Sequence, residues 1–396
     1  MVNTERIMVG YLLQHHYQLF QLLLCILFSK NNLLLELQVV QGNKEKRTRG
    51  TGMARITIKQ IAEEAGVSMT TVSNVLNKKT HRVSEEKIQL IEEIIEKHHY
   101  IPNMNARSLV NSSSKLIGLL YYSKENDFIF SDPFTSELLA GIEKESKRNG
   151  YFVLVHNVTS INDILTLQKN WNFDGFIVVG VSTESFIEID NIIKKPVVYI
   201  DTYLFEHDQK IMEKKRQCSF VNTNDYQASE TAVEFLIECS HKKIGFLSFD
   251  FEPSIPSVIQ QRHLAYKEGL EKHHIPYREE FIFGEHEFDK IQNALNQMTA
   301  LLVTSDHLAA KFVKYLKNRN SYSVETLSII GFDDVSFSEL MDPGLTTIRL
   351  EPSEKGRIAF KELRKLILGE LTKSQQIKMD GKLIVRQSVI TNSQKF

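Results

Sequence analysis

Residues 56–77 have the sequence ITIKQIAEEAGVSMTTVSNVLN, which predicts two short helices joined by a tight turn. Thr57 and Gln60 have the spacing of a capping box, in which each side chain binds the backbone of the other residue at a helix N-terminus. Gly66 suits the end of the first helix because glycine accepts a positive φ, and Ser68 suits the N-cap of the second. A turn of this length between two helices is typical of a helix-turn-helix motif.

A third helix completes a bundle that we expect over residues 53–101. Ser84 is its expected N-cap, and Glu85 and Glu86 fall in its first turn, where the helix dipole favours acidic side chains. Apolar residues recur with helical spacing at Ile88, Ile91, Ile94 and Ile95.

The charge of this bundle is uneven. Residues 53–84 hold five Lys and Arg and two Glu, a net charge of +3, whereas the third helix is acidic. The start of the second helix carries polar side chains of a length that can reach base edges in a major groove. The pattern favours DNA binding over a merely structural three-helix bundle.

Beyond residue 115 the pattern changes to short apolar runs separated by helical periods. Continuous apolar strands of this kind are typical of buried parallel sheets with crossover helices, and the length of the region predicts two α/β lobes. The predicted strands are 116–122, 151–157, 175–181, 197–201, 243–249, 300–306 and 327–334.

Acidic residues follow several of these strands. Ligands of open parallel sheets bind beyond the carboxyl ends of the strands, so we expect these carboxylates to surround a cleft. Taken singly, each is more often a helix cap or turn residue than a ligand contact. The residues are Asp201, Asp250, Asp306, Asp333 and Asp334.

The composition excludes several classes of protein. The 396 residues include 48 Lys and Arg against 49 Asp and Glu, a net charge of −1, and 42% are apolar. The apolar fraction is high enough to fill hydrophobic cores, which argues against a disordered chain. The net charge near zero does not exclude DNA binding, because a small basic domain can be balanced by an acidic remainder of the chain. Cys25, Cys218 and Cys239 are far apart, so neither a disulfide framework nor a zinc site is expected, and a reducing compartment fits.

The first 52 residues are expected to be an extension outside the folded protein. Their longest strongly apolar run, Leu19–Phe28, is too short for the roughly 20 residues that span a bilayer. No alanine precedes Ala54, so a signal-peptide cleavage site is not evident. Met53 directly precedes the predicted bundle, and we expect translation to start there, with a membrane tether as the less favoured alternative.

The ordered series of motifs resembles the lac repressor family (LacI/GalR) of transcriptional regulators. The resemblance begins with residues 56–77, YIPN at 100–103 and ARSL at 106–109. It continues through SDPF at 131–134, DGFIVVG at 174–180, HKKIGFLS at 241–248, GFDD at 331–334 and LTTIR at 345–349. It implies a helix-turn-helix head and a two-lobed, periplasmic-binding-protein-like core with parallel, doubly wound sheets.

The resemblance also implies a division of the chain. The hinge is expected at residues 102–115 and the core at 116–389, followed by a tail at 391–396. Lobe 1 would comprise about 116–221 and 348–372, and lobe 2 about 222–347 and 373–390.

For DNA, the resemblance implies one contact role for each matching residue. Bases would be contacted by Met69, Thr70 and Asn74, and phosphates by Thr57, Ser68, Thr71, Ser73 and Asn77. Arg82 lies in a loop one residue longer than the commonest pattern and would add a phosphate contact. Many members carry Arg at the position of Asn74, and Asn favours adenine instead. In the hinge segment containing Ala106, Leu109 matches the leucine that inserts into the minor groove.

For the ligand, the resemblance implies a small molecule between the lobes: a sugar, a sugar derivative or a purine. Arg262, Asp333 and Asp201 match polar pocket residues, and Phe134, Thr135 and Phe288 would add walls. Ser305 stands where many sugar-binding members have Asn. No cofactor and no metal are expected.

These expectations combine into a cytoplasmic, non-enzymatic regulator, most simply a repressor. It would act as a homodimer on near-palindromic double-stranded operator DNA, with no membrane partner. An exported sugar-binding protein is the alternative, which the helix-turn-helix disfavours. A sugar-modifying α/β enzyme is a third candidate, which the absence of nucleophile and cofactor motifs disfavours.

Overall fold

The computed structural model describes residues 56–100, 113–122, 132–212, 218–321, 325–371 and 373–391. The chain divides into two compact units, residues 1–102 and 103–396, which we call the head and the core and describe separately. The expectations for residues 1–52, Ala106 and Leu109 lie outside the described residues.

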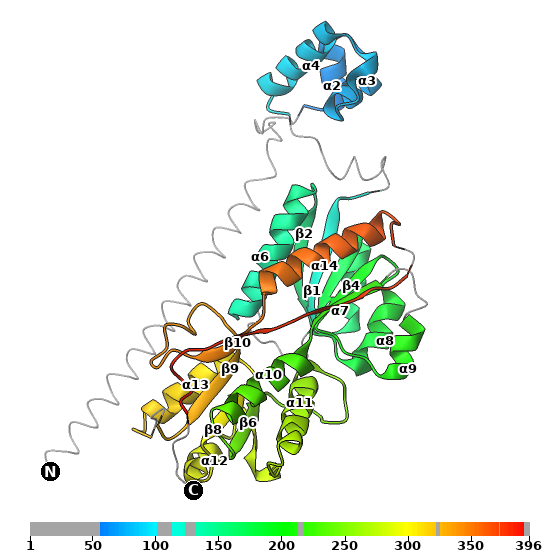
Figure 1. Cartoon of the computed structure of the whole chain (residues 1–396). Helices are drawn as coiled ribbons and strands as arrows, with labels where there is room; N and C mark the ends of the chain where they lie inside the picture. The colour runs from blue at the N-terminus through cyan, green and yellow to red at the C-terminus, as the bar shows by residue number, and fades with distance from the viewer. Residues whose placement is uncertain are drawn as a thin grey trace, which may run out of the picture. The chain divides into compact units, whose positions relative to one another are not determined.

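The head has the predicted helices, drawn in blue to cyan in Figure 1. The capping box of Thr57 and Gln60 is present, Ser68 accepts a hydrogen bond from the backbone N–H of Thr71, and Gly66 has a φ of +63°. Ser84 is the N-cap residue of the last helix, although its side chain makes no capping hydrogen bond. The elements are α2 (Ile58–Glu64), α3 (Met69–Leu76), η1 (Thr80–Arg82) and α4 (Glu85–Lys97).

The apolar stripes of these helices meet in one small core. Ile61, Val72 and Ile91 are fully buried there, with Ile94 beside them. The helical spacing of the apolar residues therefore correctly predicts which face of each helix is buried.

The first lobe is built on a parallel sheet in the order β11-β5-β4-β3-β1-β2. Helices α6 and α14 cover one face and α7 and α8 the other, so apolar side chains are needed on both sides of the central strands. The strands are β1 (Leu116–Tyr122), β2 (Phe152–Val158), β3 (Gly175–Val179), β4 (Val197–Ile200), β5 (Cys218–Thr223) and β11 (Gln376–Met379). The helices are α6 (Pro133–Arg148), α7 (Ile161–Asn170), α8 (Thr183–Ile192), α9 (Glu206–Met212) and α14 (Pro352–Ile367).

The second lobe has a sheet in the order β12-β10-β9-β8-β6-β7, parallel except for β12. Helices α10 and α11 cover one face, and α12 and α13 the other (Figure 1). The strands are β6 (Ile244–Ser248), β7 (Ile282–Gly284), β8 (Ala300–Val303), β9 (Ser328–Asp333), β10 (Thr346–Arg349) and β12 (Lys382–Ile384). The helices are α10 (Asp225–Glu238), α11 (Val258–Lys272), η3 (Glu279–Phe281), α12 (Phe288–Asn293), η4 (Leu295–Gln297) and α13 (Asp306–Lys317).

The crossovers between lobes differ from the expected boundaries. Strand β11 pairs with β5 and so belongs to the first lobe, although residues 373–390 were assigned to the second. Strand β10 pairs with β9, so the second lobe extends to Arg349. The chain changes lobe after β5, after β10 and after β11. The boundaries were misplaced because β11 is a half-exposed edge strand with little apolar signal.

Helices α6 and α14 are in very close contact in the first lobe. A Cβ atom on Gly141 would lie 1.9 Å from the carbonyl oxygen of Ser353, and one on Gly356 would lie 2.3 Å from that of Leu138. Only glycine allows this approach, because the opposing atoms belong to the backbone and cannot move aside alone. Among the described helices, none is both long and apolar enough to cross a membrane.

Candidate functional site

The head presents the predicted DNA-contacting side chains on its surface. Met69 is 56% exposed, which is unusual for a large apolar side chain, and Thr70 beside it is exposed as well. Thr57, Ser68, Asn77 and Arg82 are also exposed, whereas Thr71, Ser73 and Asn74 are partly buried. All nine described residues therefore remain candidates for DNA contact.

Hydrogen bonds within the head hold several of these side chains in place. The hydroxyl groups of Ser68 and Thr71 are 2.9 Å apart. The Asn77 Nδ2 group donates to the carbonyl oxygen of Ser73 at 2.8 Å, which fixes the C-terminal end of α3. Ordered side chains of this kind lose little entropy when they bind a phosphate.

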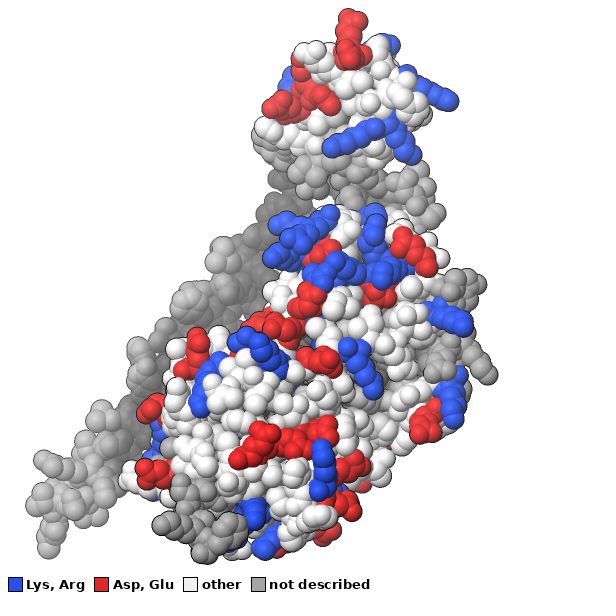
Figure 2. Space-filling view, in the orientation of Figure 1, with Lys and Arg blue, Asp and Glu red and all other residues white. Residues whose placement is uncertain are grey.

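The acidic side chains of the head gather over α4, and lysine and arginine side chains project from other parts of its surface (Figure 2). Glu64, on α2, is neutralised locally, because Lys97 Nζ and His98 Nε2 each lie 2.8 Å from its carboxylate. The hydrogen bond from Lys97 lowers the pKa of Glu64, and His98 adds to the effect. The turn after α3 holds three exposed basic residues, Lys78, Lys79 and Arg82, which suit contacts to phosphates.

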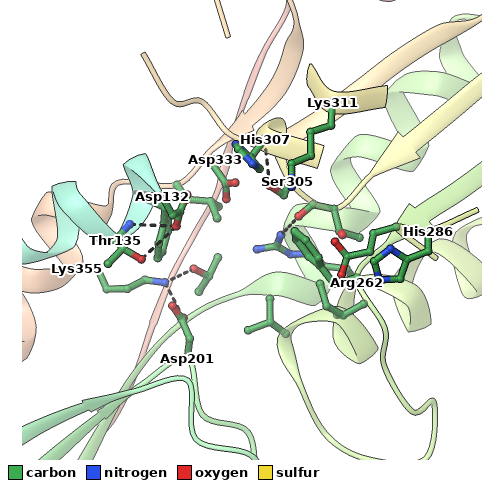
Figure 3. Close-up of a pocket in the computed structure, with 18 residues that line it drawn as sticks. Asp132, Thr135, Asp201, Arg262, His286, Ser305, His307, Lys311, Asp333 and Lys355 are labelled. Carbon is green, nitrogen blue, oxygen red and sulfur yellow. Dashed lines mark hydrogen bonds and ion pairs between the residues drawn. The ribbon is translucent and has the colours of Figure 1, made fainter. Parts of the chain in front are cut away.

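The core contains a cavity of about 630 Å³ beyond the carboxyl ends of the strands of both sheets (Figure 3). Its size is that of a small-molecule site. Six of the seven predicted ligand-binding residues line it: Phe134, Thr135, Asp201, Arg262, Ser305 and Asp333. The other lining residues are Asp132, Thr223, Phe249, Val258, Ile259, Glu285, His286, Thr304, His307, Lys311, Leu350 and Lys355.

Arg262 of α11 is the best-anchored residue of the second-lobe wall. Its Nε and Nη2 atoms donate to Asp225 Oδ1 at 2.8 and 2.7 Å, and Nη1 donates to the carbonyl oxygen of Thr304 at 2.6 Å. Its guanidinium lies 4.2 Å from the centre of the Phe332 ring. Burial opposes the charge of Arg262, but Asp225 and Asp333 raise its pKa, so it stays charged. Two guanidinium N–H groups remain for a ligand.

Asp333 places a partly buried carboxyl group at the same wall. Burial raises the pKa of Asp333 well above its ordinary value, and the nearby carboxyl group of Asp306 raises it further, while Arg262 lowers it. The carboxyl oxygens of Asp333 can accept hydrogen bonds, which suits a ligand hydroxyl. Thr304, with its Oγ1 buried and unpartnered among the described atoms, adds another polar group to the wall.

The other carboxylates that follow strands do not line the cavity. Asp306 accepts hydrogen bonds from Ser338 and from Thr347 Oγ1, the latter at 2.6 Å. Asp334 forms ion pairs with Arg349 and Arg386. Asp250 is also outside the lining, so the expectation that all five surround the cleft was wrong for these three. Asp306 and Asp334 instead bind side chains of the second lobe, and Asp250 is exposed on its surface.

The first-lobe wall is organised around a buried lysine that the sequence did not suggest. Lys355 of α14 is 2% exposed, and its Nζ donates to Asp201 Oδ1 and to Thr223 Oγ1, both at 2.7 Å. The Phe134 ring centre lies 5.2 Å from Nζ. Asp201 itself has a φ of +49°, which turns its carboxylate out of the strand direction toward the cavity. Lys355 and Asp201 thus offer a ligand one donor and one acceptor side by side.

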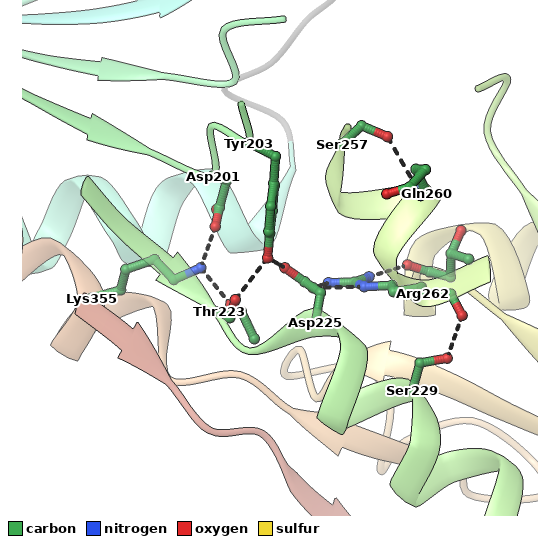
Figure 4. Close-up of polar contacts among 10 residues, drawn as sticks. Asp201, Tyr203, Thr223, Asp225, Ser229, Ser257, Gln260, Arg262 and Lys355 are labelled. Carbon is green, nitrogen blue, oxygen red and sulfur yellow. Dashed lines mark hydrogen bonds and ion pairs between the residues drawn. The ribbon is translucent and has the colours of Figure 1, made fainter. Parts of the chain in front are cut away.

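A continuous polar path joins the two walls (Figure 4). The Tyr203 hydroxyl donates to Asp225 Oδ2 at 2.6 Å and lies 2.8 Å from the carbonyl oxygen of Thr223. Burial and the neighbouring Asp225 raise the pKa of Tyr203, so the phenol stays protonated. Because Tyr203 belongs to the first lobe and Asp225 to the second, this hydrogen bond crosses between lobes and ends on Arg262.

Phe288 is a wrong ligand-site prediction. Its ring packs edge-on against Phe312 and Tyr315, with ring centres 5.2 and 5.4 Å away, inside the second lobe. The loop that precedes α12 does reach the cavity, but through Glu285 and His286. Phe288 is the first residue of α12, and its apolar ring completes the contact between α12 and α13.

The described residues contain no group of three or more His, Cys, Asp or Glu side chains arranged to hold a metal ion.

Comparisons with known proteins agree with this geometry. Residues 57–103 match the model of bacterial regulatory proteins of the lacI family, and residues 233–389 match a periplasmic binding protein-like domain. The chain is 29% identical over 352 residues to the probable HTH-type transcriptional regulator EndR of Paenibacillus polymyxa, covering 85% of this chain and 96% of that protein. It is 28% identical over 349 residues to the repressor PurR of Actinobacillus pleuropneumoniae, covering 84% and 98%.

Solved structures show the same fold. The lac repressor dimer bound to operator and the anti-inducer ONPF has a TM-score of 0.69 at 22% identity, covering 85% of this chain and 99% of that one. The complex of the regulator CelR with cellobiose has a TM-score of 0.60 at 21% identity, covering 84% and 100%.

A helix-turn-helix head joined to a two-lobed, periplasmic-binding-protein-like core defines a DNA-binding transcriptional regulator. The chain belongs to the lacI family of bacterial regulatory proteins.

Proposed function

We propose that this protein is a transcriptional repressor whose affinity for operator DNA is set by a small polar ligand in the cavity between its lobes. The observation that carries the ligand-dependent part is the hydrogen bond between Tyr203 and Asp225. A ligand held by Arg262 on one side and by Lys355 and Asp201 on the other would change the free energy of this interlobe contact. Such a differential affinity for two states is what couples two sites.

The ligand class is a sugar, a sugar derivative or a purine. Paired donors and acceptors at Lys355–Asp201 and at Arg262–Asp333 suit vicinal hydroxyl groups or a purine edge. Phe134 and Phe249 provide aromatic faces. The relatives are regulators, which supports a protein that binds its ligand without turning it over.

The DNA site is proposed to be a near-palindromic duplex contacted by two heads of a cytoplasmic homodimer. A two-fold protein requires two-fold DNA, and each α3 would enter a major groove through Met69, Thr70 and Asn74. Thr57, Ser68, Thr71, Ser73, Asn77 and Arg82 would contact phosphates, and Ala106 and Leu109 of the hinge the minor groove. Asn74 predicts an adenine at the base that it contacts.

The ligand is identified first by thermal-shift screening of sugars, sugar phosphates and purines against the full chain. The operator is selected from random duplex DNA by its affinity for the protein. We then expect binding to this operator to change by at least about fivefold when the ligand is added.

The matched variants are Arg262→Lys, which keeps the charge but removes the fixed fork of donors, and Arg278→Lys on the surface. Arg262→Lys should lose the ligand-induced thermal shift, and Arg278→Lys should keep it. A ligand that shifts the melting temperature without changing operator binding would contradict the proposed coupling. Turnover of the ligand by the purified protein would contradict a purely regulatory role.

A further inference from the structure

The first-lobe sheet has a strongly basic edge at the amino ends of its strands, opposite to the cavity. The strand starts are in register, with Leu116 beside Phe152 and Val197 beside Cys218, so the residues that precede them share one face. Lysines lie just before three of these strands: Lys115 before β1, Lys194 and Lys195 before β4, and Lys373 before β11. We call this surface, together with the helix ends described next, the basic face.

Helix ends add further cations to this face. Lys147 and Arg148 end α6, and Lys169 lies at the end of α7, while Arg364 lies near the end of α14. The Lys115 Nζ lies 4.2 Å from the Tyr151 ring centre. The Tyr151 ring lies 5.6 Å from that of Phe360, so β1, β2 and α14 meet here. Figure 2 shows several blue side chains over the ends of α6 and α14, with fewer red side chains among them.

The helix dipole accounts for only part of this charge. Cations are favoured at helix C-termini, which explains the residues of α6, α7 and α14. It does not explain Lys115 or Lys373, which lie in segments that lead into strands.

Acidic side chains neutralise the basic face only in part, and Glu370 is an exposed acidic residue between Arg364 and Lys373. Glu145 is 3.5 Å from Arg148, and Glu362 is 2.6 Å from Lys365. Asp174 is buried and accepts hydrogen bonds from the backbone N–H groups of Ser114 and Lys115, at 2.8 and 3.1 Å. By contrast, no ion pair is found among the described residues for Lys147, Lys169, Lys194, Lys195 or Arg364, so their charges are available.

An exposed indole lies among these cations. Trp171 is the single tryptophan of the chain and is 49% exposed. It lines a cavity of about 380 Å³ with Lys169, Lys195, Asn170 and Asn172. Cations interleaved with an exposed aromatic side chain are typical of nucleic-acid-binding surfaces.

The linker to the head enters the core at this same face, since Asp174 anchors residues 113–115. Only residues 101–112 separate this anchor from the head. DNA bound by the head would therefore be tethered through a short linker to the lobe that carries the basic face.

We propose that the basic face is a second, sequence-independent DNA-binding surface that contacts the phosphate backbone. This second surface depends on the proposed function only in that the head binds DNA. The surface would add affinity for any duplex while the head supplies sequence discrimination.

The test compares two charge reversals in the full chain. One is the triple variant Lys169→Glu, Lys194→Glu and Lys195→Glu on the basic face. The control is Lys243→Glu, Lys314→Glu and Lys382→Glu, exposed lysines of the second lobe with the same total change of charge. Affinity for a duplex of about 30 base pairs without operator sequence is measured by fluorescence anisotropy as salt rises from about 50 to 200 mM.

We expect the basic-face variant to reduce the slope of log affinity against log salt by about 2 to 3, because each lost phosphate contact contributes about 0.9. The control should leave the slope within about 0.5 of the wild type. Equal slopes of log affinity against log salt for the two variants would overturn the proposal. The basic face would then fit an acidic protein rather than DNA.

Trp171 gives an independent readout at low salt. Duplex DNA should quench or shift its fluorescence in the wild type and in the control, and not in the basic-face variant. Unchanged Trp171 emission in the wild type, at duplex concentrations where anisotropy shows binding, would also overturn the proposal. If instead the wild type bound neither selected operator nor any other duplex, the proposed function itself would fail.

Discussion

The two ends of the first-lobe sheet use charge in opposite ways. At the carboxyl end, Lys355 and Asp201 are largely buried, paired and held by fixed hydrogen bonds. At the amino end, Lys194 and Lys195 are exposed, of one sign and without a described ion pair. Buried pairs fix geometry, which a small ligand requires, whereas exposed like charges act additively on an extended polyanion. This difference in charge arrangement shows how the two ends of one sheet can bind ligands of different size.

The largest effect in this comparison is expected from Arg262→Met, which breaks a buried ion pair at the cavity. Asp225 would remain buried without its counterion, so the free energy of unfolding should fall by about 3–5 kcal/mol. Urea unfolding followed by circular dichroism measures the change. Arg364→Met at the amino end should change stability by less than about 0.5 kcal/mol. A similar loss in both variants would remove the distinction between the two ends.

Lys355→Met should destabilise the protein by less, about 2–3 kcal/mol. Asp201 lines the cavity, so water can partly solvate its unpaired carboxylate. The same urea experiment measures it, with Lys361→Met on the exposed side of α14 as the control. A neutral result would mean that the Lys355–Asp201 pair contributes no net stability, and that its role is confined to the ligand.

Asp306 should give the carboxyl end of the second lobe a distinctive pH dependence. Burial raises the pKa of Asp306 to about 7, opposed by hydrogen bonds from Ser338 and Thr347. Because the folded state holds this proton more tightly than the unfolded state, the group's contribution to stability is present at low pH and is lost as pH rises toward 7. In Asp306→Asn, urea midpoints should therefore fall less between about pH 4 and pH 7 than in the wild type. Parallel curves for the two proteins would contradict the raised pKa.

The smallest effect is expected from Lys194→Gln with Lys195→Gln. Neither side chain has a described ion-pair partner in the fold, so the free energy of unfolding should stay within about 0.5 kcal/mol of the wild-type value. The salt dependence of DNA binding should nevertheless weaken. A stability loss well above this value would mean that the lysines belong to the fold rather than to a binding surface.

The sequence predicted the central strands and the head because their signals are local. Strands β1, β3, β4, β6, β8 and β9 are continuous apolar runs, and the caps of α2 and α3 are set by residues three positions apart. Strand β5 was missed because Ser219, Asn222 and Thr223 interrupt its apolar pattern, although all three are buried. Strands β11 and β12 are short and half-exposed, so neither alternation nor hydrophobicity marks them.

The cavity was only partly predictable for a related reason. Arg262, Asp201 and Asp333 stand in motifs that resemble a known family, so position alone suggested them. Lys355 lies among charged residues of an amphipathic helix, where a lysine ordinarily faces solvent. Its burial depends on contacts with Asp201 and Thr223, which are distant in sequence. The local sequence pattern therefore does not predict these contacts.

The glycine contact between α6 and α14 limits how the core can move. Because backbone presses on backbone at Gly141 and Gly356, neither helix can slide along the other without a steric clash. The first lobe must therefore turn as one solid piece, and any opening of the cavity has to come from bending at the three crossover segments between the lobes. A ligand that changed the angle between the lobes would therefore move both ends of this sheet together, including the edge where Asp174 holds residues 113–115.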